Sequence, residues 1–232
     1  MTEKARIDHL VVAAASLEEG VRWCQSTLGV TPGPGGAHAL FGTHNRLVRL
    51  SSPEHPLVYL EIIAIDSSVN PSRTSPLRRW FDLDAPAIHK HLDESGPRLL
   101  HWVARVPNIS ASVADLGSLG IDRGRVIEAS RPAAQGLLRW KITVRDDGQR
   151  LFGGALPTLI EWGSEHPVCS MAEPVIALRS LRVQHPLAEQ LQSALAAVGF
   201  TTLPVTVGPP GLSADLTLAD GTILCLSHSE VP

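Results

Sequence analysis

The order of secondary-structure signals repeats along this chain, and the repetition constrains the fold more than any single motif does. In each repeat, a short β-branched segment predicts a strand, an amphipathic segment predicts a helix, and three further segments predict strands. The first repeat comprises residues 7–14, 17–28, 38–42, 46–51 and 57–65. The second comprises 99–106, 108–119, 125–130, 136–146 and 157–163, and the third comprises 176–184, 187–198, 201–207, 213–218 and 222–227. We therefore predict an α+β fold of repeated βαβββ modules.

The repeats group into two predicted regions. Residues 5–165 hold a pair of modules, at 5–66 and 98–165, and the connector 67–97 between them contains a helical candidate at 85–94. A third βαβββ-like module occupies residues 174–229. We expect it to be structural, because it lacks the polar pattern that marks the first two modules and a further module can cover a sheet edge.

Composition excludes several classes of partner. A chain of 232 residues with a formal charge of -3 and no dense Lys/Arg run lacks the electrostatic footprint of a nucleic-acid binder. Its apolar runs are too short to span a bilayer, and the N-terminal segment does not resemble a signal peptide. The three cysteines form no CxxC pair, which suits a reducing compartment. We expect a cytoplasmic protein that binds neither nucleic acid nor membranes and acts on a small molecule.

Each of the first two modules carries a histidine in its first strand and a glutamate in its last. These are His9 and Glu61, then His101 and Glu161. Alternation along the strand places His9 on one face with Ile7 and Val11. Ionisable groups among apolar neighbours need partners, because burying an unpaired charge costs several kcal/mol.

A metal ion would satisfy all four side chains at once. Two imidazoles and two carboxylates make a mixed site suited to Zn, Ni, Fe, Mn or Co, with positions left open for a substrate. The alternative stays open that each histidine is a hydrogen-bonded core residue, paired with the glutamate of its own module.

The placement of these pairs resembles the vicinal oxygen chelate superfamily, and more narrowly its glyoxalase-like members. The segments that carry the likeness are DHLVV from Asp8, LGVTPGPGGAH from Leu28, GTHN from Gly42, YLEI from Tyr59 and LIEW from Leu159. The resemblance implies curved mixed sheets that surround a metal at His9, Glu61, His101 and Glu161.

As function, the resemblance implies a divalent-metal-dependent lyase or isomerase of glyoxalase type, acting on a small substrate with vicinal oxygens. Glu161 or Glu61 would be the general base. A metal-free small-molecule binding protein of the same fold is the alternative. An extradiol-type dioxygenase ranks lowest, because the third strand of the second module has no histidine and Tyr59 is the only phenol. Both a monomer and a homodimer are compatible with this pattern.

Further polar residues are candidates for substrate binding. They are His38, Thr43, His44 and Asn45, around two glycine-rich turns, and Arg139 in the second module. A β-turn and strand edge held by Asn45 and Thr43 is an equally good interpretation of the first group. Arg139 and Lys141 share one face of their strand, while Trp140 points to the other face and is expected in the core. A basic and aromatic cluster in the connector, at residues 73–81, lines a cleft or forms a solvated face.

Overall fold

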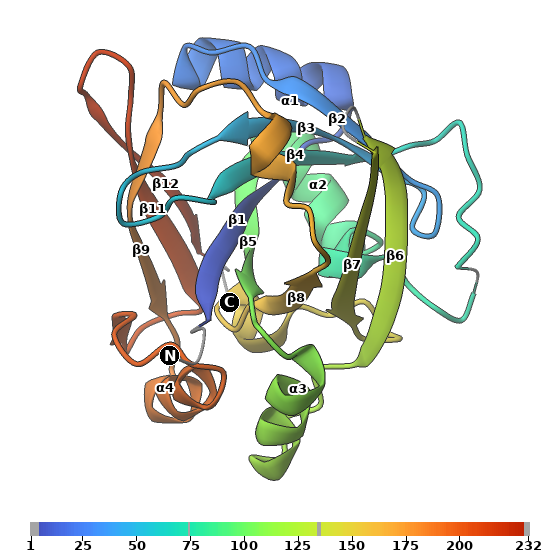
Figure 1. The fold of residues 1–232 in the computed structure, drawn as a ribbon, viewed down its shortest axis with the longest axis vertical. Helices are drawn as coiled ribbons and strands as arrows, with labels where there is room; N and C mark the ends of the chain where they lie inside the picture. The colour runs from blue at the N-terminus through green and yellow to red at the C-terminus, as the bar shows by residue number, and fades with distance from the viewer. Residues whose placement is uncertain (1–4, 74, 134–135, 230–232) are drawn as a thin grey trace.

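The computed structural model describes residues 5–73, 75–133 and 136–229, and residues 1–4, on which part of the signal-peptide prediction rests, lie outside that part. Four α-helices and twelve strands follow each other in the described ranges (Figure 1). They are β1 Arg6–Ala13, α1 Leu17–Trp23, β2 Gly33–His38, β3 Thr43–Arg49, β4 Tyr59–Ile65, α2 Pro86–Ser95, β5 Arg98–Arg105, α3 Ile109–Ser118, β6 Arg125–Ala133, β7 Gly136–Val144, β8 Thr158–Trp162, β9 Ala177–Gln184, α4 Ala188–Ala197, β10 Val205–Thr206, β11 Gly211–Thr217 and β12 Ile223–Ser229.

The first two repeats share one eight-stranded sheet in the order β2-β3-β4-β1-β5-β8-β7-β6. Within each repeat the first and last strands pair in parallel, β1 with β4 and β5 with β8, and the repeats join through the antiparallel pair β1 and β5. The sheet is therefore mixed and internally repeated, which confirms the predicted α+β fold of βαβββ modules. The division of the chain into the two predicted regions stays a prediction.

The third repeat keeps the order of elements but not the order of strands. Its sheet runs β10-β9-β11-β12, so that β9 pairs with β11 and the last strand is at the edge. In the first two repeats the last strand is the neighbour of the first. The third module therefore lacks the adjacency of first and last strands that brings their side chains together in module one.

Local signals explain the helix limits, and one strand differs from its prediction. Ser16 caps α1 by accepting a hydrogen bond from Glu19 N, and the helix ends in a π-helical turn, Cys24–Leu28, before Gly29 at φ 71°. The prediction of a strand at 38–42 was wrong, because His38 O accepts bonds from the amides of Phe41 and Gly42 and closes a turn there. The strand lies earlier, at β2, whose glycines allow close approach to β3.

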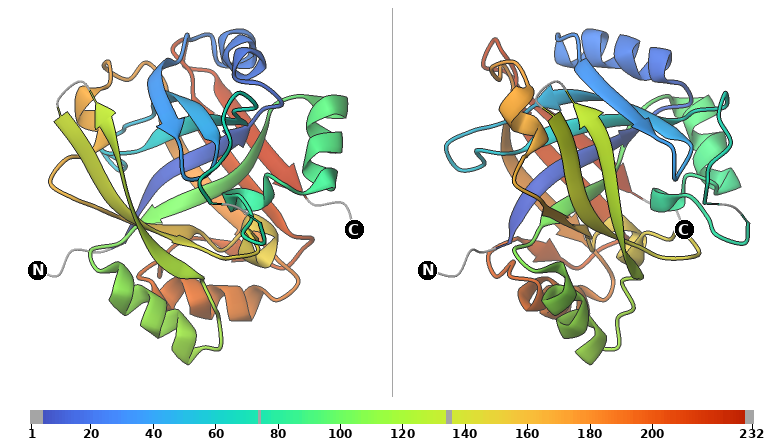
Figure 2. Two further views of the ribbon diagram at one scale, coloured as in Figure 1. Left: turned by 90° about the vertical axis from the view of Figure 1, so that its right-hand side faces the viewer. Right: turned by 45° about the vertical axis from the view of Figure 1, so that its right-hand side comes forward.

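Two apolar clusters cover the two faces of the large sheet. The outer cluster includes Leu10, Leu60 and Trp102, and it continues into the third module through Leu191 and Leu216. Figures 1 and 2 accordingly show β9, β11 and β12 as a second layer beside β1 and β5. The third module thus buries the outer face of the central strands, where hydrophobic burial is the main source of stability.

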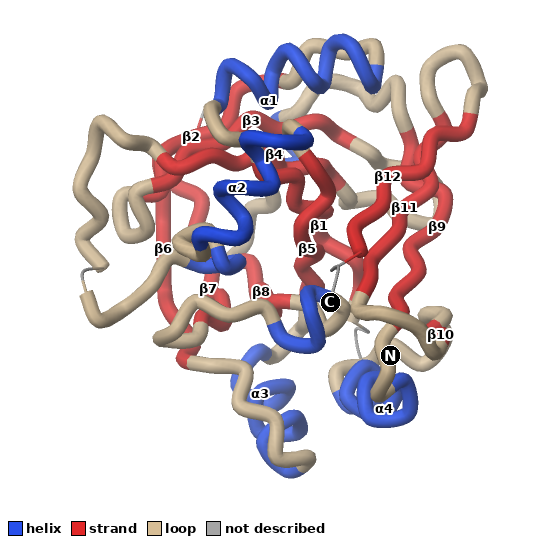
Figure 3. Tube along the Cα trace, turned by 180° about the vertical axis from the view of Figure 1, so that it is seen from behind, coloured by secondary structure: helices blue, strands red, loops and turns tan. Residues whose placement is uncertain are grey.

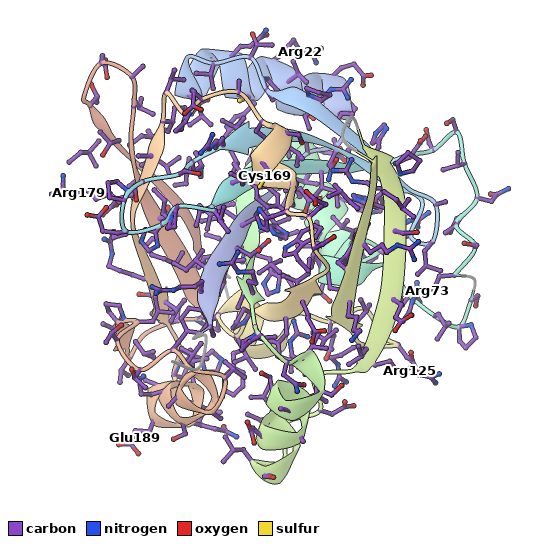
Figure 4. The ribbon with its side chains drawn as sticks, in the orientation of Figure 1. Arg22, Arg73, Arg125, Cys169, Arg179 and Glu189 are labelled. Atoms are coloured by element: carbon purple, nitrogen blue, oxygen red, sulfur yellow. The ribbon has the colours of Figure 1, made fainter. Side chains whose placement is uncertain are left out.

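The inner face is enclosed because the sheet curls on itself. The two terminal strands of the sheet, β2 and β6, approach each other, and Arg131 Nη1 on β6 donates to Gly35 O on β2 over 3.3 Å. The connector covers part of this face: α2, nearest the viewer in Figure 3, packs Ile88 and Leu92 into the inner cluster. Side chains fill the enclosed space, as Figure 4 shows. No helix of the described ranges is long and apolar enough to cross a membrane.

Candidate functional site

His9 and Glu61 meet on the inner face of the curled sheet. They lie on the neighbouring strands β1 and β4, and His9 Nε2 is 3.6 Å from Glu61 Oε2. A register shift between Ile7 and His9 explains how the histidine turns inward. Because of this irregularity Ile7 packs in the outer cluster, so the expectation that it shares a face with His9 was wrong, while Val11 lies in the inner cluster as expected. Both site residues are at least 95 % buried.

Asp8 contacts the ring nitrogen of His9 that does not face Glu61. Its Oδ1 is 2.7 Å from His9 Nδ1, and its Oδ2 accepts bonds from Trp162 Nε1 at 2.9 Å and His166 Nε2 at 3.1 Å. Burial alone would raise the pKa of this carboxyl, but the bonds from His166 and His9 outweigh it, and the pKa lies below its usual value. Asp8 is therefore ionised, fixes the proton of His9 on Nδ1, and leaves Nε2 directed at Glu61.

Asn45 orients the glutamate. Its Nδ2 donates to Glu61 Oε1 over 2.5 Å, and its Oδ1 accepts from the amide of Gly36 over 2.8 Å, which fixes the direction of the amide group. His38 lies beside it, with Nε2 3.4 Å from Asn45 Nδ2 and Nδ1 3.1 Å from Thr43 Oγ1. Burial, with the nearby Arg131 cation, lowers the pKa of His38 to about 4 despite the opposing charge of Glu61, so its ring is neutral at pH 7.

These side chains border a small cavity between the two modules. Its volume is about 30 Å³, enough for a water or two or for one small functional group of a ligand. Module one and the connector line one side of it, and β6, β7 and β8 line the other. The lining residues are His9, His38, Asn45, Leu47, Tyr59, Glu61, Trp80, Phe81, Arg131, Trp140, Ile142, Ile160 and Trp162. Phe81 has φ 59°, a left-handed backbone that non-glycine residues seldom adopt and that often occurs at functional sites.

His101 does not join this group. The register of β5 shifts between its pairs with Val11 and Val12, and the ring of His101 turns toward the start of β8. Its Nδ1 is 3.1 Å from Gly154 O, and its Nε2 accepts from the amide of Thr158 over 3.1 Å. Both nitrogens are thus engaged by a neutral ring, and burial keeps the pKa of His101 well below its usual value. The residue is a hydrogen-bonded core histidine, as in the alternative interpretation, but its partners are Gly154 and Thr158 and not Glu161 of its own module.

Glu161 also lies outside the cavity, on the opposite face of β8. Ile160 and Trp162 line the cavity, so alternation turns the side chain between them outward. There Glu161 accepts from Lys141 Nζ over 2.9 Å and from the amide of Ile109 over 2.7 Å. Glu61 and Glu161 occupy strands that match in the repeat, but a one-residue difference in register reverses the face that a side chain occupies.

The four-ligand metal centre therefore does not fit this arrangement. Two of its members, His9 and Glu61, converge, while His101 and Glu161 are bonded elsewhere. Across the described part of the chain, no group of three or more His, Cys, Asp or Glu side chains is arranged to hold an ion. We assign no chemical step to a divalent metal.

The predicted substrate-binding residues divide between the two faces in the same way. His38 and Asn45 line the cavity, and Thr43 supports His38. His44 turns away, with Nδ1 3.7 Å from Asp66 Oδ2, because it alternates with its neighbours on β3. Arg139 is exposed on the outer face of β7, beside Lys141.

Several cavity residues escaped the sequence analysis. Asp8 appeared only within a motif, and Tyr59 was named as the one phenol but not as a site residue, although it stacks on His9 with ring centroids 4.6 Å apart. Trp80 and Phe81 belong to the connector cluster for which a cleft was one of two interpretations. His166 gave no signal at all, and it reaches Asp8 from a short helix, Pro167–Ser170, that it caps. Their convergence depends on the curl of the sheet, which local patterns do not encode.

Comparisons with known proteins agree with this architecture. A family profile described as a glyoxalase-like domain matches residues 7–199. No curated protein matches the sequence. A hypothetical protein from Staphylococcus aureus superposes with a TM-score of 0.62 at 13 % identity, covering 99 % of this chain and 88 % of that one.

Two methylmalonyl-CoA epimerases are also similar in structure. The enzyme of Streptomyces coelicolor has a TM-score of 0.43 at 18 % identity, covering 71 % of this chain and 99 % of that one. The enzyme of Mycobacterium tuberculosis has a TM-score of 0.39 at 19 % identity, covering 71 % and 91 %. At these levels we take no residue role or substrate from them.

Proposed function

The chain belongs to the glyoxalase-like domain family and has the vicinal oxygen chelate fold, and from that premise we propose that it is a lyase or isomerase of small molecules. In this proposal His9 and Glu61 move a proton at a carbon atom next to a carbonyl or carboxyl group of the substrate. The single observation that carries it is the buried pair itself, with His9 Nε2 3.6 Å from Glu61 Oε2 at the wall of a cavity.

The surroundings of the pair suit acid–base chemistry. A carboxylate that holds one ring nitrogen of a histidine orients the ring and stabilises its protonated form when the other nitrogen takes up a proton. Asp8 stands in that relation to His9, and Asn45 holds Glu61 Oε1 so that Oε2 remains toward His9. Glu61 would take the proton from carbon and pass it to His9 Nε2, 3.6 Å away, and the imidazolium would return it to the substrate, so that both groups end as they began; His9 could equally take the proton first and pass it to Glu61.

The cavity supplies the second requirement, which is exclusion of water. Aromatic and aliphatic side chains form most of its wall, and a low local dielectric strengthens the interactions of charged groups inside it. The predicted four-ligand ion is not needed by this mechanism, in which the two residues act on the substrate directly. Glu161, a candidate base in the sequence analysis, has no part in it.

Exchange of substrate protons with solvent tests the proposal. The protein would be incubated in D₂O with a panel of 2-oxo acids and 2-hydroxy acids, and loss of the α-proton signal followed by ¹H NMR. We expect exchange with one or more members of the panel. Glu61→Gln should slow it by about 10²- to 10⁴-fold, the usual contribution of a general base, while the matched Glu161→Gln variant should retain it.

Two outcomes would contradict this function. Saturable binding of panel members without exchange would favour the metal-free binding protein, the alternative that the fold also allows. One equivalent of a divalent ion in protein purified without chelators, lost in both His101→Ala and Glu161→Gln, would reinstate the four-ligand centre.

A further inference from the structure

The small cavity bordered by His9 and Glu61 adjoins a larger one. The second cavity has a volume of about 360 Å³ and lies between β2 and β3, residues of β6 and β7, and the segment that follows β8. Leu47 and Arg131 line both cavities, so these two residues mark the place where they meet. A volume of this size is typical of pockets that take small organic ligands.

The larger cavity has mostly apolar walls. Its aliphatic lining includes Val30, Leu47, Val48, Leu138, Met171 and Val175. Two of its charged groups lie together at its exposed rim, where Arg49 Nη1 is 3.5 Å from Glu173 Oε1. The cavity therefore suits an alkyl or aromatic body better than a polar one.

Arg131 lies where the two cavities meet, and some of its N–H donors have no protein acceptor among the residues that the structure describes. Its side chain lies over the glycine pair of β2, where a Cβ on Gly36 would come within 3.0 Å of Nη1. The guanidinium offers five N–H donors, and the protein acceptor it reaches is Gly35 O, at 3.3 Å. No carboxylate of the described residues forms an ion pair with it. A half-buried guanidinium in this state is a receptor for a carboxylate, which it binds with two parallel hydrogen bonds.

We propose that the natural ligand is an amphipathic carboxylate. Its carboxylate binds Arg131 where the cavities meet, and its apolar body fills the larger cavity. The inference rests on the proposed function in that both use the cavity bordered by His9 and Glu61. It adds the charge and the polarity of the substrate, which the acid–base pair alone does not specify.

Calorimetric titration with straight-chain carboxylates from butanoate to decanoate tests this inference. Affinity should rise roughly three- to fourfold for each added methylene until the larger cavity is full. The corresponding primary amides, which lack the charge, should bind about ten- to a hundredfold more weakly. Equal affinity for acid and amide, or no dependence on chain length, would overturn the proposal.

Variants identify the residues involved. Arg131→Gln should abolish the preference for the acid over the amide. Arg139→Gln, which alters an exposed arginine on the outer face of β7, is the matched control and should bind like the parent. A preference for the acid that survives in Arg131→Gln, or one that is lost in Arg139→Gln, would refute the assignment.

The Glu61→Gln variant separates this inference from the proposed function. If it binds octanoate like the parent while proton exchange is lost, both stand. If octanoate binds with the expected dependence on chain length and charge but the parent exchanges no protons of any panel member, the ligand class stands and the enzymatic function fails. If none of the straight-chain carboxylates binds while exchange occurs, the amphipathic ligand class is wrong and the function stands.

Discussion

Replacement of Asp8 by asparagine should disrupt both the stability of the protein and the orientation of His9. The carboxylate is 1 % exposed and accepts bonds from His9 Nδ1, Trp162 Nε1 and His166 Nε2. An asparagine presents one acceptor oxygen and one NH₂ group, so one side of the site faces donor against donor unless a ring changes tautomer. If His9 responds by moving its proton to Nε2, that atom can no longer accept a proton from substrate.

The expected loss in the free energy of unfolding follows from the number of hydrogen bonds that Asp8 accepts. Hydrogen bonds to a charged group contribute about 1.5–3 kcal/mol and neutral ones about 0.5–1.5 kcal/mol, so each of the three bonds loses about 1 kcal/mol. The mismatch at the NH₂ group adds about 1–3 kcal/mol. We therefore expect Asp8→Asn to lower the free energy of unfolding by about 4–6 kcal/mol at pH 7.

Urea unfolding of Asp8→Asn and its parent measures this difference, with Asp115→Asn, an exposed aspartate on α3, as the matched control expected within about 0.5 kcal/mol of the parent. Because the pKa of Asp8 is lowered by folding, its stabilisation is present above the unfolded-state pKa of about 4 and is lost as the pH falls through the folded-state pKa. The gap between parent and variant should therefore narrow below about pH 4. A loss under about 1 kcal/mol at pH 7, or a gap that widens in acid, would refute the reasoning.

Three further predictions concern other parts of the fold. Gly35→Ala should lower the free energy of unfolding in urea by several kcal/mol, because its Cβ would lie 2.2 Å from Asn45 O. Gly117→Ala on α3, whose Cβ would meet nothing within 4 Å, should raise it by up to about 1 kcal/mol. Similar changes in stability in the two variants would contradict this prediction. Burial, with two nearby arginines, lowers the pKa of His228 to about 3, so the unfolded state binds more protons than the folded state between about pH 6.5 and 3. As the pH is lowered through this range, the free energy of unfolding should fall by up to about 1.4 kcal/mol per pH unit. The same dependence on pH in His228→Gln would count against this prediction. Glu161→Gln should weaken the contact with α3 and lower the free energy of unfolding by about 1–2 kcal/mol. Octanoate should bind this variant with the parental affinity. Weaker binding would contradict the assignment of Glu161 to the outer face of the sheet.

The sequence predicted the architecture because the relevant signals are local and repeated. Strand and helix patterns recur with the same order in each module, and the caps at Ser16 and Gly29 mark the limits of the first helix. The order of strands in the third module was not predictable in this way, since it depends on which edge of β9 is free to pair with β11.

The site was predictable only where strand alternation holds without interruption. In module one, Glu61 shares its face with Ile63, and the position of His9 follows once the irregularity at Asp8 is known. In module two, the parallel between the repeats predicted that Glu161 faces the site, but a one-residue difference in register turns its side chain to the opposite face of β8. Arg131 and Trp80 reach the cavity from β6 and the connector, and only the closure of the sheet brings them there.

The most direct test of the central claim is ¹⁵N–¹H NMR of the histidine rings during titration with octanoate. The claim is that His9 borders the ligand cavity while His101 is a bonded core residue. We predict that the ring resonances of His9, assigned with His9→Gln, shift as the cavity fills, and that those of His101 stay fixed with the proton on Nδ1. Shifts at His101 with none at His9, under conditions where octanoate binds, would contradict the account.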